Sequence, residues 1–497
     1  MAREAAVRGL SVLLVDARDV AAGTSSRSSR LVHGGLRYLR NGHFALVREA
    51  LHERERLLRL APHLVRPLPM LMPFFDDGGG KPWQLRLGTW LYSRLAGRST
   101  LPRPRRRSAD EAVRAFPGLR RQGLRSAIEF FDARTQDARL TLANVLAAVE
   151  AGCEFANYVE AVAARGDDLV LLDRIGGDEV RVRYRHVLNA AGPAVDRVRA
   201  AFEVGGEPLV RCSRGSHVVL PARAGELALA AFLPDERIQF VIPHAGGTLC
   251  GTTDVDDELE GDETGPPVED LDYLHAALGS LLEPPPERAD VQFAYAGWRA
   301  LPRGKGPPGG LNREAFTVTE PLPHGELHTV VGGKLTTHRS FAERTIARLF
   351  SLRDPSPTRA LALPGGDGPR EVDDPLWWRY GSRVGRLRAL LAEQPEWRRP
   401  LCRHRPFLLV ELVHALRDEG AVTFADVMLR RLVDPRGPCR EPHCLQRAYA
   451  AFVEHRRFVV EGAADEAIAD LQRECDELCG ALATWRAAAP SSDGGGA

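Results

Sequence analysis

The spacing of apolar and polar residues changes along the chain, and each change predicts a different kind of element. The apolar run LSVLLV at residues 10–15 ends at Asp16, which is typical of a buried parallel strand with a carboxylate at its carboxyl end. Residues 1–9 read as the end of a helix that stops at Gly9. Apolar positions at helical spacing predict a helix over residues 43–60.

The middle of the chain mixes short strands with helices, and its end is helical. Strands are predicted at residues 155–163, 168–174, 180–190 and 327–331. Helices are predicted at residues 137–151 and from the turn after residue 331 to about Phe350. Short alternating runs over residues 206–325 predict an antiparallel sheet. From Leu361 onward the pattern is helical and rich in arginine.

Composition narrows the classes of function. The 497 residues allow two or three domains. The net charge of +1 gives no global field that would attract a nucleic acid, so no nucleic-acid partner is predicted. Only three lysines occur against 64 arginines, which draws attention to Lys334.

The eight cysteines are scattered, which suits a reducing cytoplasm better than a disulfide framework. Cys439, His443 and Cys444 raise the question of a zinc site. A fourth ligand at suitable spacing is missing, so no metal site is predicted.

The stretch GTSSRSSRLVHGGLRYLR at residues 23–40 carries the densest chemistry. Its small and hydroxylic start, Thr24-Ser25-Ser26, allows close approach to a phosphate or a ring. The hinge Gly34-Gly35 follows, with the acid/base group of His33 before it. The fixed cation of Arg37 and the phenol of Tyr38 come after it.

Two further turns follow predicted strands. Asn189-Ala190-Ala191-Gly192-Pro193 joins a strand to a helix, as in dinucleotide-contact turns. Gly332-Gly333-Lys334-Leu335-Thr336-Thr337 combines glycines that permit close approach to a planar ring with threonines that can cap a helix. The positive end of that helix would face an anionic group.

These motifs resemble those of the FAD-dependent glycerol-3-phosphate dehydrogenases, in which a TSS…SSKLIHGGLRYL segment lies under the flavin. The likeness extends through residues 44–64 and the DARL segment at residues 137–140. It continues in RGSH at residues 214–217, GTTD at 251–254, YAGWRAL at 295–301 and NRE at 312–314. Arginine, rather than the family's lysine, begins RGSH, and Ala300 replaces a usual proline.

The resemblance implies an α/β fold of the glycine oxidase and D-amino-acid oxidase type. It would combine a discontinuous Rossmann-like FAD-binding domain, an antiparallel β cap and a carboxy-terminal helical domain. The expected ranges are 1–75, 125–205 and 326–352 for the FAD-binding domain, 76–124 and 206–325 for the cap, 360–485 for the helical domain and 486–497 for a disordered tail.

The resemblance also implies the site residues. The expected catalytic residues are His33, Arg37, Arg299 and Lys334. The expected substrate-binding residues are Arg37, Tyr38, Arg299, Arg313 and Lys334. The expected FAD-binding residues are Asp16, Thr24, Ser25, Ser26, His33, Gly34, Gly35, Val159, Ala191, Gly192, Thr253, Gly333, Lys334, Leu335 and Thr336. His33 is the leading general base because its ordinary pKa lies near the working pH. A histidine that only hydrogen-bonds the flavin or backbone is the alternative, with Lys334 or Arg299 sharing proton transfer.

The implied reaction is oxidation of sn-glycerol 3-phosphate to dihydroxyacetone phosphate, with electrons passing through FAD to a membrane quinone. The protein would then rest on the cytoplasmic face of the membrane, and a homodimer is compatible with the resemblance. Residues 83–98 read either as a basic amphipathic segment on lipid headgroups or as a helix packed on a neighbouring domain. PRPRRR at residues 102–107 reads as a solvated loop that adds attraction to anionic lipid.

Three rivals stay open. A glycerol-3-phosphate oxidase would use oxygen as the acceptor, and an amine or amino-acid oxidase fits the HGGLRY and GGKLTT turns less well. The dinucleotide fingerprint places its glycine turn about 20 residues before an acid such as Asp16, and that position lies outside this sequence. We therefore expect either a start codon assigned too late or a fragment that holds no FAD.

Overall fold

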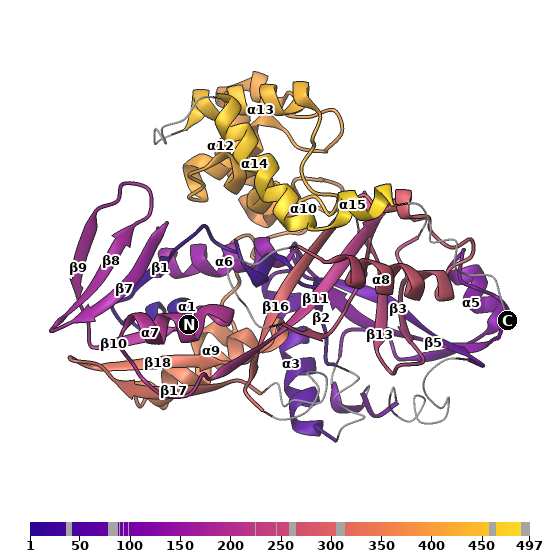
Figure 1. The fold of residues 1–497 in the computed structure, drawn as a ribbon, viewed down its shortest axis with the longest axis horizontal. Coiled ribbons are helices and arrows are strands. Elements are labelled where there is room, and N and C mark those ends of the chain that lie inside the picture. Colours follow the sequence, from indigo (N-terminus) through magenta and orange to yellow (C-terminus); the bar gives the residue numbers. More distant parts are fainter. Residues whose placement is uncertain are drawn as a thin grey trace.

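The computed structural model describes residues 1–35, 42–77, 88, 90–92, 94–97, 99–223, 225–244, 246–257, 265–304, 314–456 and 464–488. Its elements form a nucleotide-binding part with short parallel strands, a ten-stranded sheet and a layer of carboxy-terminal helices (Figure 1). No helix among these residues is long and apolar enough to cross a membrane.

The nucleotide-binding part contains two separate parallel strand pairs among the described residues. Strand β1 (Leu13–Asp16) pairs with β6 (Glu154–Asn157), and β10 (His186–Asn189) pairs with β18 (Glu326–Val331). Strand β17 (Phe316–Pro321) adds to β18 in antiparallel fashion. The carboxyl ends of β10 and β18 meet at one edge, which brings together the two turns that follow them.

The helices of this part agree with the sequence pattern. They are α1 (Ala2–Ala6), α3 (Phe44–Leu60), α6 (Asp137–Glu150), α7 (Val195–Ala201) and α9 (His338–Leu349). The first helix ends in a turn in which Gly9 has a φ of +79°, as its expected C-cap role requires. Strand β1 is less buried than predicted, since the Leu13 side chain is 43% exposed.

Two predicted strands are each divided in the structure. Tyr158 has a φ of +58°, which separates β6 from β7 (Val159–Arg165). Residues 180–190 divide into β9 (Glu179–Arg183) and β10. With β8 (Asp168–Asp173), β7 and β9 form a small antiparallel sheet that projects from the molecule (Figure 1).

The ten-stranded sheet is larger than the predicted cap. Its strands are β2 (Leu31–Val32), β3 (Arg66–Phe75), β4 (Arg105–Ser108), β5 (Leu124–Arg134), β11 (Val210–Leu220), β12 (Ala228–Phe232), β13 (Ile238–His244), β14 (Gly247–Gly251), β15 (Val255–Asp256) and β16 (Phe293–Pro302). Among the described strand pairs of this sheet, only β12–β3 is parallel. Strands β2, β3 and β5 fall in ranges predicted for the FAD-binding domain, yet they pair within this sheet.

The prediction of a solvated loop at residues 102–107 is wrong for its second half. Arg105–Ser108 form β4 on the edge of β5, where Arg105 and Arg107 both donate hydrogen bonds to the Glu129 carboxylate. A shared carboxylate across the strand pair offsets the repulsion between the two arginines. Ser108 then caps α5 (Ala109–Ala115).

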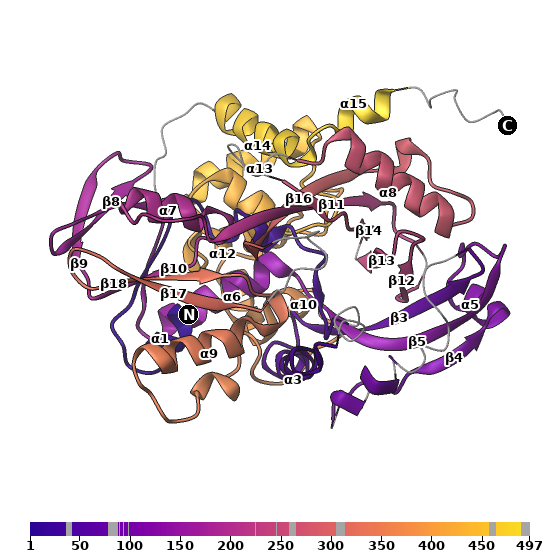
Figure 2. The ribbon, with the colours of Figure 1, turned by 60° about the horizontal axis from the view of Figure 1, so that its bottom comes forward.

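The sheet and the helical layer meet through the end of the chain. The layer contains α10 (Trp377–Tyr380), α11 (Val384–Glu393), α12 (Leu409–Asp418), a π-helical turn (Asp426–Arg431), α13 (Pro442–His455), α14 (Ala464–Cys479) and α15 (Leu482–Ala487). Helix α15 lies beside α8 (Val268–Leu281) of the sheet domain (Figure 2). The indole N–H of Trp485 donates to Asp272 at 2.7 Å. The predicted tail thus begins as helix to Ala487.

Candidate functional site

One hydroxyl joins the two strongest sequence motifs. The backbone N–H of His33 donates to Oγ1 of Thr336 at 3.1 Å, and that hydroxyl donates to the His33 carbonyl at 3.1 Å. The two residues are 303 positions apart in the chain. The hydroxyl therefore holds the HGG turn against the GGKLTT turn, as one site requires.

The glycines of the HGG turn fit it for different reasons. A Cβ on Gly34 would lie 2.6 Å from atoms of Leu51 and Tyr92, so only glycine fits there. Gly35 has a φ of +74°, and its N–H donates to Nδ1 of His33 at 3.1 Å. With Nδ1 accepting, the neutral ring of His33 carries its proton on Nε2. His33 thus presents a donor rather than a free base.

The TSS segment lies against strand β16. Thr24 Oγ1 donates to the Trp298 carbonyl at 2.8 Å, directly before Arg299. Ser26 donates to the Gly23 carbonyl at 3.2 Å, and Ser25 is exposed. The first part of the 23–40 motif and the predicted substrate arginine are therefore neighbours.

Arg299 is held by the GTTD turn. Its Nη2 donates to Thr252 Oγ1 at 3.0 Å and to the Thr253 carbonyl at 3.2 Å, and its Nη1 lies 3.4 Å from Asp254. Its side chain is 23% exposed. The guanidinium is thus oriented by neighbours and keeps open surface for an anion.

The side chain of Thr253, a predicted FAD-binding residue, bonds to other residues of the protein. Its hydroxyl accepts the Ser216 N–H at 2.8 Å and donates to Asp270 at 3.2 Å. The residue is 1% exposed. Its side chain therefore fixes the GTTD turn that carries the partners of Arg299.

Strands β1 and β10 each lead into residues that were predicted to bind FAD. Asp16 accepts the Arg18 N–H at 3.0 Å. Asp16 is exposed at the end of β1, and loss of hydration in the surrounding protein raises the pKa of its carboxyl to about 6. Val159 begins β7 nearby and is half-buried, and Ala191 is exposed.

Two glycines leave room at the strand ends. Gly192 has a φ of +60°, and no atom lies within 4 Å of a Cβ built there. Gly333 has a φ of +111° and is exposed beside Lys334, which is half-buried. Leu335 packs against the buried cluster that contains Leu57. The backbone at both turns is thus open to a large planar or phosphorylated group.

Some predicted site residues lie outside the described residues. They are Arg37, Tyr38 and Arg313, together with much of the 83–98 segment. Their roles stay predictions.

The structure adds site residues that the motifs did not single out. Tyr92, from the 83–98 segment, accepts the Gly34 N–H and donates to Asp132, both at 2.8 Å. Nε2 of His217, in the RGSH strand, is hydrogen-bonded to the Ser29 hydroxyl at 2.8 Å. Burial, reinforced by the nearby Arg299 charge, lowers the pKa of His217 to about 3.

Comparison with known proteins first identifies the class of protein. Residues 1–339 match the family model described as FAD dependent oxidoreductase, so the chain belongs to that family. Residues 329–433 match the model described as the C-terminal domain of alpha-glycerophosphate oxidase. FAD is the cofactor of this family, and the open glycines at residues 192 and 333, with the Asp16 carboxylate at the end of β1, fit it.

Individual relatives narrow the class. The glycerol-3-phosphate dehydrogenase of Mycobacterium leprae (strain TN) is 35% identical over 461 residues, covering 87% of this chain and 78% of that protein. The D-erythritol 1-phosphate dehydrogenase of Brucella abortus (strain 2308) is 36% identical over 378 residues, covering 74% and 75%. The structure of the Bacillus halodurans glycerol-3-phosphate dehydrogenase complexed with FAD has the same fold, with a TM-score of 0.73 and 24% identity over 96% of this chain and 92% of that one. The chain belongs to the glycerol-3-phosphate dehydrogenase family.

Proposed function

We propose that the protein oxidises the secondary alcohol of sn-glycerol 3-phosphate to dihydroxyacetone phosphate and passes the electrons to a membrane quinone. The observation that carries this proposal is the double hydrogen bond between Thr336 and His33, which brings the HGG and GGKLTT turns into one site. Relatives named for phosphorylated polyols support the substrate class.

The phosphate of the substrate would be bound by Arg299. Its guanidinium is pre-oriented by Thr252 and Asp254, so little conformational entropy is lost when an anion binds. We assign Lys334, at the turn facing His33, a contact with the substrate hydroxyl. Arg37, Tyr38 and Arg313 would complete the substrate site.

When bound, FAD would supply the hydride acceptor, and the hydroxyl proton of the substrate would be left for a protein side chain to accept. As folded, Nε2 of His33 carries a proton, and its Nδ1 is bonded to the Gly35 N–H. We therefore assign His33 the role of a hydrogen-bond donor that orients the substrate or cofactor. Lys334, in its neutral form, is the proton acceptor in this scheme.

We further propose that the membrane surface is contacted by the 83–107 region. Trp90 is 58% exposed, and the guanidinium carbon of Arg94 lies 6.0 Å from its ring centre. An exposed tryptophan beside a cation suits a lipid headgroup layer. Contact with a membrane would bring the protein close to a membrane quinone, which supports quinone as the electron acceptor. Oxygen is the rival acceptor, and the assay below tests it.

A purified, FAD-loaded full chain would test the reaction. We expect turnover of sn-glycerol 3-phosphate with a soluble quinone analogue, little hydrogen peroxide, slower turnover of D-erythritol 1-phosphate and almost none of glycerol. Arg299→Ala should lower kcat/KM for the phosphorylated substrate about 10- to 100-fold, the loss typical of one charge-assisted contact. Arg181→Ala, at an exposed position on β9, is the control. Equal activity toward glycerol would overturn the proposal, and peroxide as main product would replace quinone by oxygen.

A further inference from the structure

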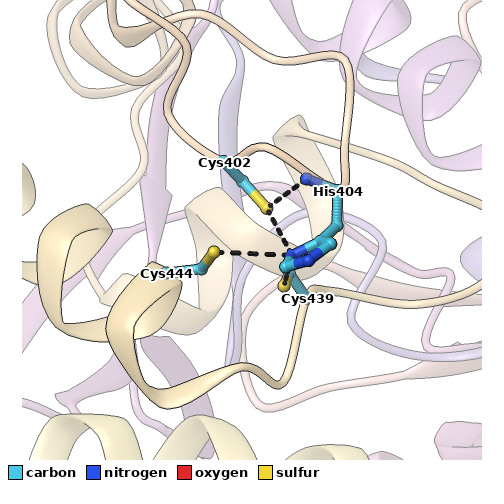
Figure 3. Close-up of side chains that lie close together, drawn as sticks. All are labelled: Cys402, His404, Cys439 and Cys444. Atoms are coloured by element: carbon cyan, nitrogen blue, oxygen red, sulfur yellow. Dashed lines mark hydrogen bonds between the residues drawn. The ribbon is translucent and has the colours of Figure 1, made fainter.

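Four metal-ligating side chains converge in the helical layer, away from the site described above. Cys402 and His404 lie on the loop before α12, Cys439 lies just before α13, and Cys444 is in its first turn (Figure 3). Their ligand atoms all lie within 4.8 Å of one another. The three cysteines are only 4–6% exposed, and His404 lies at the surface.

The distances match a tetrahedral zinc ion. Nδ1 of His404 lies 3.8 Å from the sulfur of Cys402, 3.3 Å from that of Cys439 and 3.5 Å from that of Cys444. Zinc bonds of about 2.3 Å to sulfur and about 2.0–2.1 Å to nitrogen, at tetrahedral angles, separate the two ligand atoms by about 3.6 Å. Each observed distance lies close to that value.

Hydrogen bonding among neutral groups does not account for the arrangement. A neutral imidazole nitrogen accepts through one lone pair, yet three sulfurs surround the same Nδ1 (Figure 3). The backbone N–H of His404 also donates to the Cys402 sulfur at 3.2 Å. Such N–H contacts to sulfur are the outer-shell contacts that orient and stabilise metal-bound thiolates.

We infer that Cys402, His404, Cys439 and Cys444 bind one zinc ion. Three thiolates and one imidazole form a closed ligand set with no position for water, which is the composition of a structural site rather than a catalytic one. Soft sulfur ligands select zinc over hard cations such as magnesium. The spacing of the ligand atoms fits a single ion better than an iron–sulfur cluster.

The sequence-based objection to a metal was the missing fourth ligand. In the structure, two of the ligands come from the pair Cys402-x-His404. His404 lies 35 residues before Cys439 in the sequence. His443, the histidine considered from sequence, is not part of the group. It is exposed on α13 beside Cys444.

The ion would fix a segment that reaches the substrate-side sheet. Between the two ligand pairs, Arg405 donates to the Gly437 carbonyl at 3.1 Å. Gly437 packs so closely on Phe293 of β16 that a Cβ would lie 2.6 Å from its ring. Strand β16 also carries Arg299. The zinc ion would thus brace the helical layer against the strand that presents the substrate arginine.

Metal analysis of the purified full chain tests the inference directly. Expressed with zinc present and dialysed exhaustively, the wild-type protein should hold about one zinc per chain by inductively coupled plasma mass spectrometry. Cys439→Ser and Cys444→Ser should each reduce the content severalfold, whereas His443→Gln should keep the wild-type value. A wild-type protein without zinc whose three thiols react fully under denaturing conditions would overturn the inference, as would a disulfide among them.

Two further measurements keep the test decisive if a cysteine variant folds poorly. Cobalt-exchanged wild-type protein should show thiolate-to-cobalt charge transfer and the visible bands of tetrahedral cobalt. A strong chelator should lower the Tm of the wild-type protein and of His443→Gln alike. Octahedral cobalt bands, or an unchanged Tm after complete zinc removal, would contradict a structural tetrahedral site.

Discussion

The backbone N–H of Gly34 donates a hydrogen bond to the phenol oxygen of Tyr92 at 2.8 Å. The same hydroxyl donates to the Asp132 carboxylate, which also accepts from Arg54 at 2.7 Å. Burial, strengthened by the Asp132 charge, holds the pKa of Tyr92 well above its ordinary value, so the hydroxyl stays protonated. A residue of the proposed membrane-contact segment therefore supports the HGG turn.

Tyr92→Phe tests this support. The substitution leaves the buried Gly34 N–H without its acceptor and removes one donor from Asp132, so we expect a loss of about 1–3 kcal/mol in the free energy of unfolding. Weaker FAD retention should accompany it. Urea unfolding and flavin absorbance measure both. Tyr273→Phe is the control, because its hydroxyl binds Asp235 at the surface. Equal losses in the two variants would show that Tyr92 has no special role.

The His33 assignment makes a prediction about pH profiles. Because Nδ1 of His33 accepts the Gly35 N–H, the role we assign to His33 is that of a hydrogen-bond donor through Nε2. His33→Gln can retain such a donor, so we expect it to keep more activity than His33→Ala. The acidic limb of kcat/KM against pH should persist in both variants. Disappearance of that limb in His33→Gln would identify His33 as the general base instead.

Sequence reasoning succeeded where a motif is local and failed where partners come from distant segments. The HGG and GGKLTT turns are each recognisable from their own residues, whereas the hydrogen bonds of Thr336 that join them are seen only in the structure. The group around His404 has no such local pattern, because its two ligand pairs approach only through the packing of α12 and α13.

The misplaced strands have a similar physical cause. Arg66–Phe75 contains three prolines, which exclude a regular helix but do not reveal a strand's partner. In the structure β3 pairs with β5 along its length and with β12 in parallel. Sheet pairing and register depend on tertiary packing, so the pattern of residues along one strand does not reveal them.

Asp19 connects the nucleotide-binding part to the helical layer, and its removal should be costly. The carboxylate is buried and forms ion pairs with Arg430 at 2.8 Å and Arg431 at 2.7 Å. Asp19→Asn leaves two buried guanidinium groups short of their counter-charge, so we expect about 3–5 kcal/mol of destabilisation, measured by urea unfolding. Asp76→Asn breaks an exposed pair with Arg125 and should change little. A mild effect of Asp19→Asn would mean that Asp426 and Glu474 suffice for Arg430.

Trp90→Glu tests the proposed membrane contact. Replacing an exposed indole by a carboxylate removes an interfacial anchor and adds repulsion from anionic lipid. We expect binding to vesicles that contain phosphatidylglycerol to fall severalfold in sedimentation assays, while activity with a soluble quinone analogue is kept. Ile175→Glu, at a similarly exposed position on the β8–β9 hairpin, is the control. An equal fall in both variants would place the contact elsewhere.

His217 should make the protein sensitive to acid. It is buried, stacked on Tyr295 with ring centres 5.0 Å apart, and its pKa is lowered to about 3 by burial and by Arg299 and Arg30. A folded pKa below the unfolded value of about 6.5 means that its stabilising contribution is complete above pH 6.5. That contribution falls by up to about 1.4 kcal/mol per pH unit as the pH drops toward 3.

The measurement compares urea unfolding at pH 7 and pH 5. His217→Gln removes the titrating group while keeping a polar partner for Ser29. Between pH 7 and pH 5 the free energy of unfolding of this variant should therefore fall less than that of the wild type, and the two falls should differ by up to about 2 kcal/mol. His324→Gln, at an exposed position, should fall as the wild type does. Parallel falls in all three proteins would show that the pKa of His217 is the same in the folded and the unfolded protein, which would contradict its lowering by burial and by Arg299.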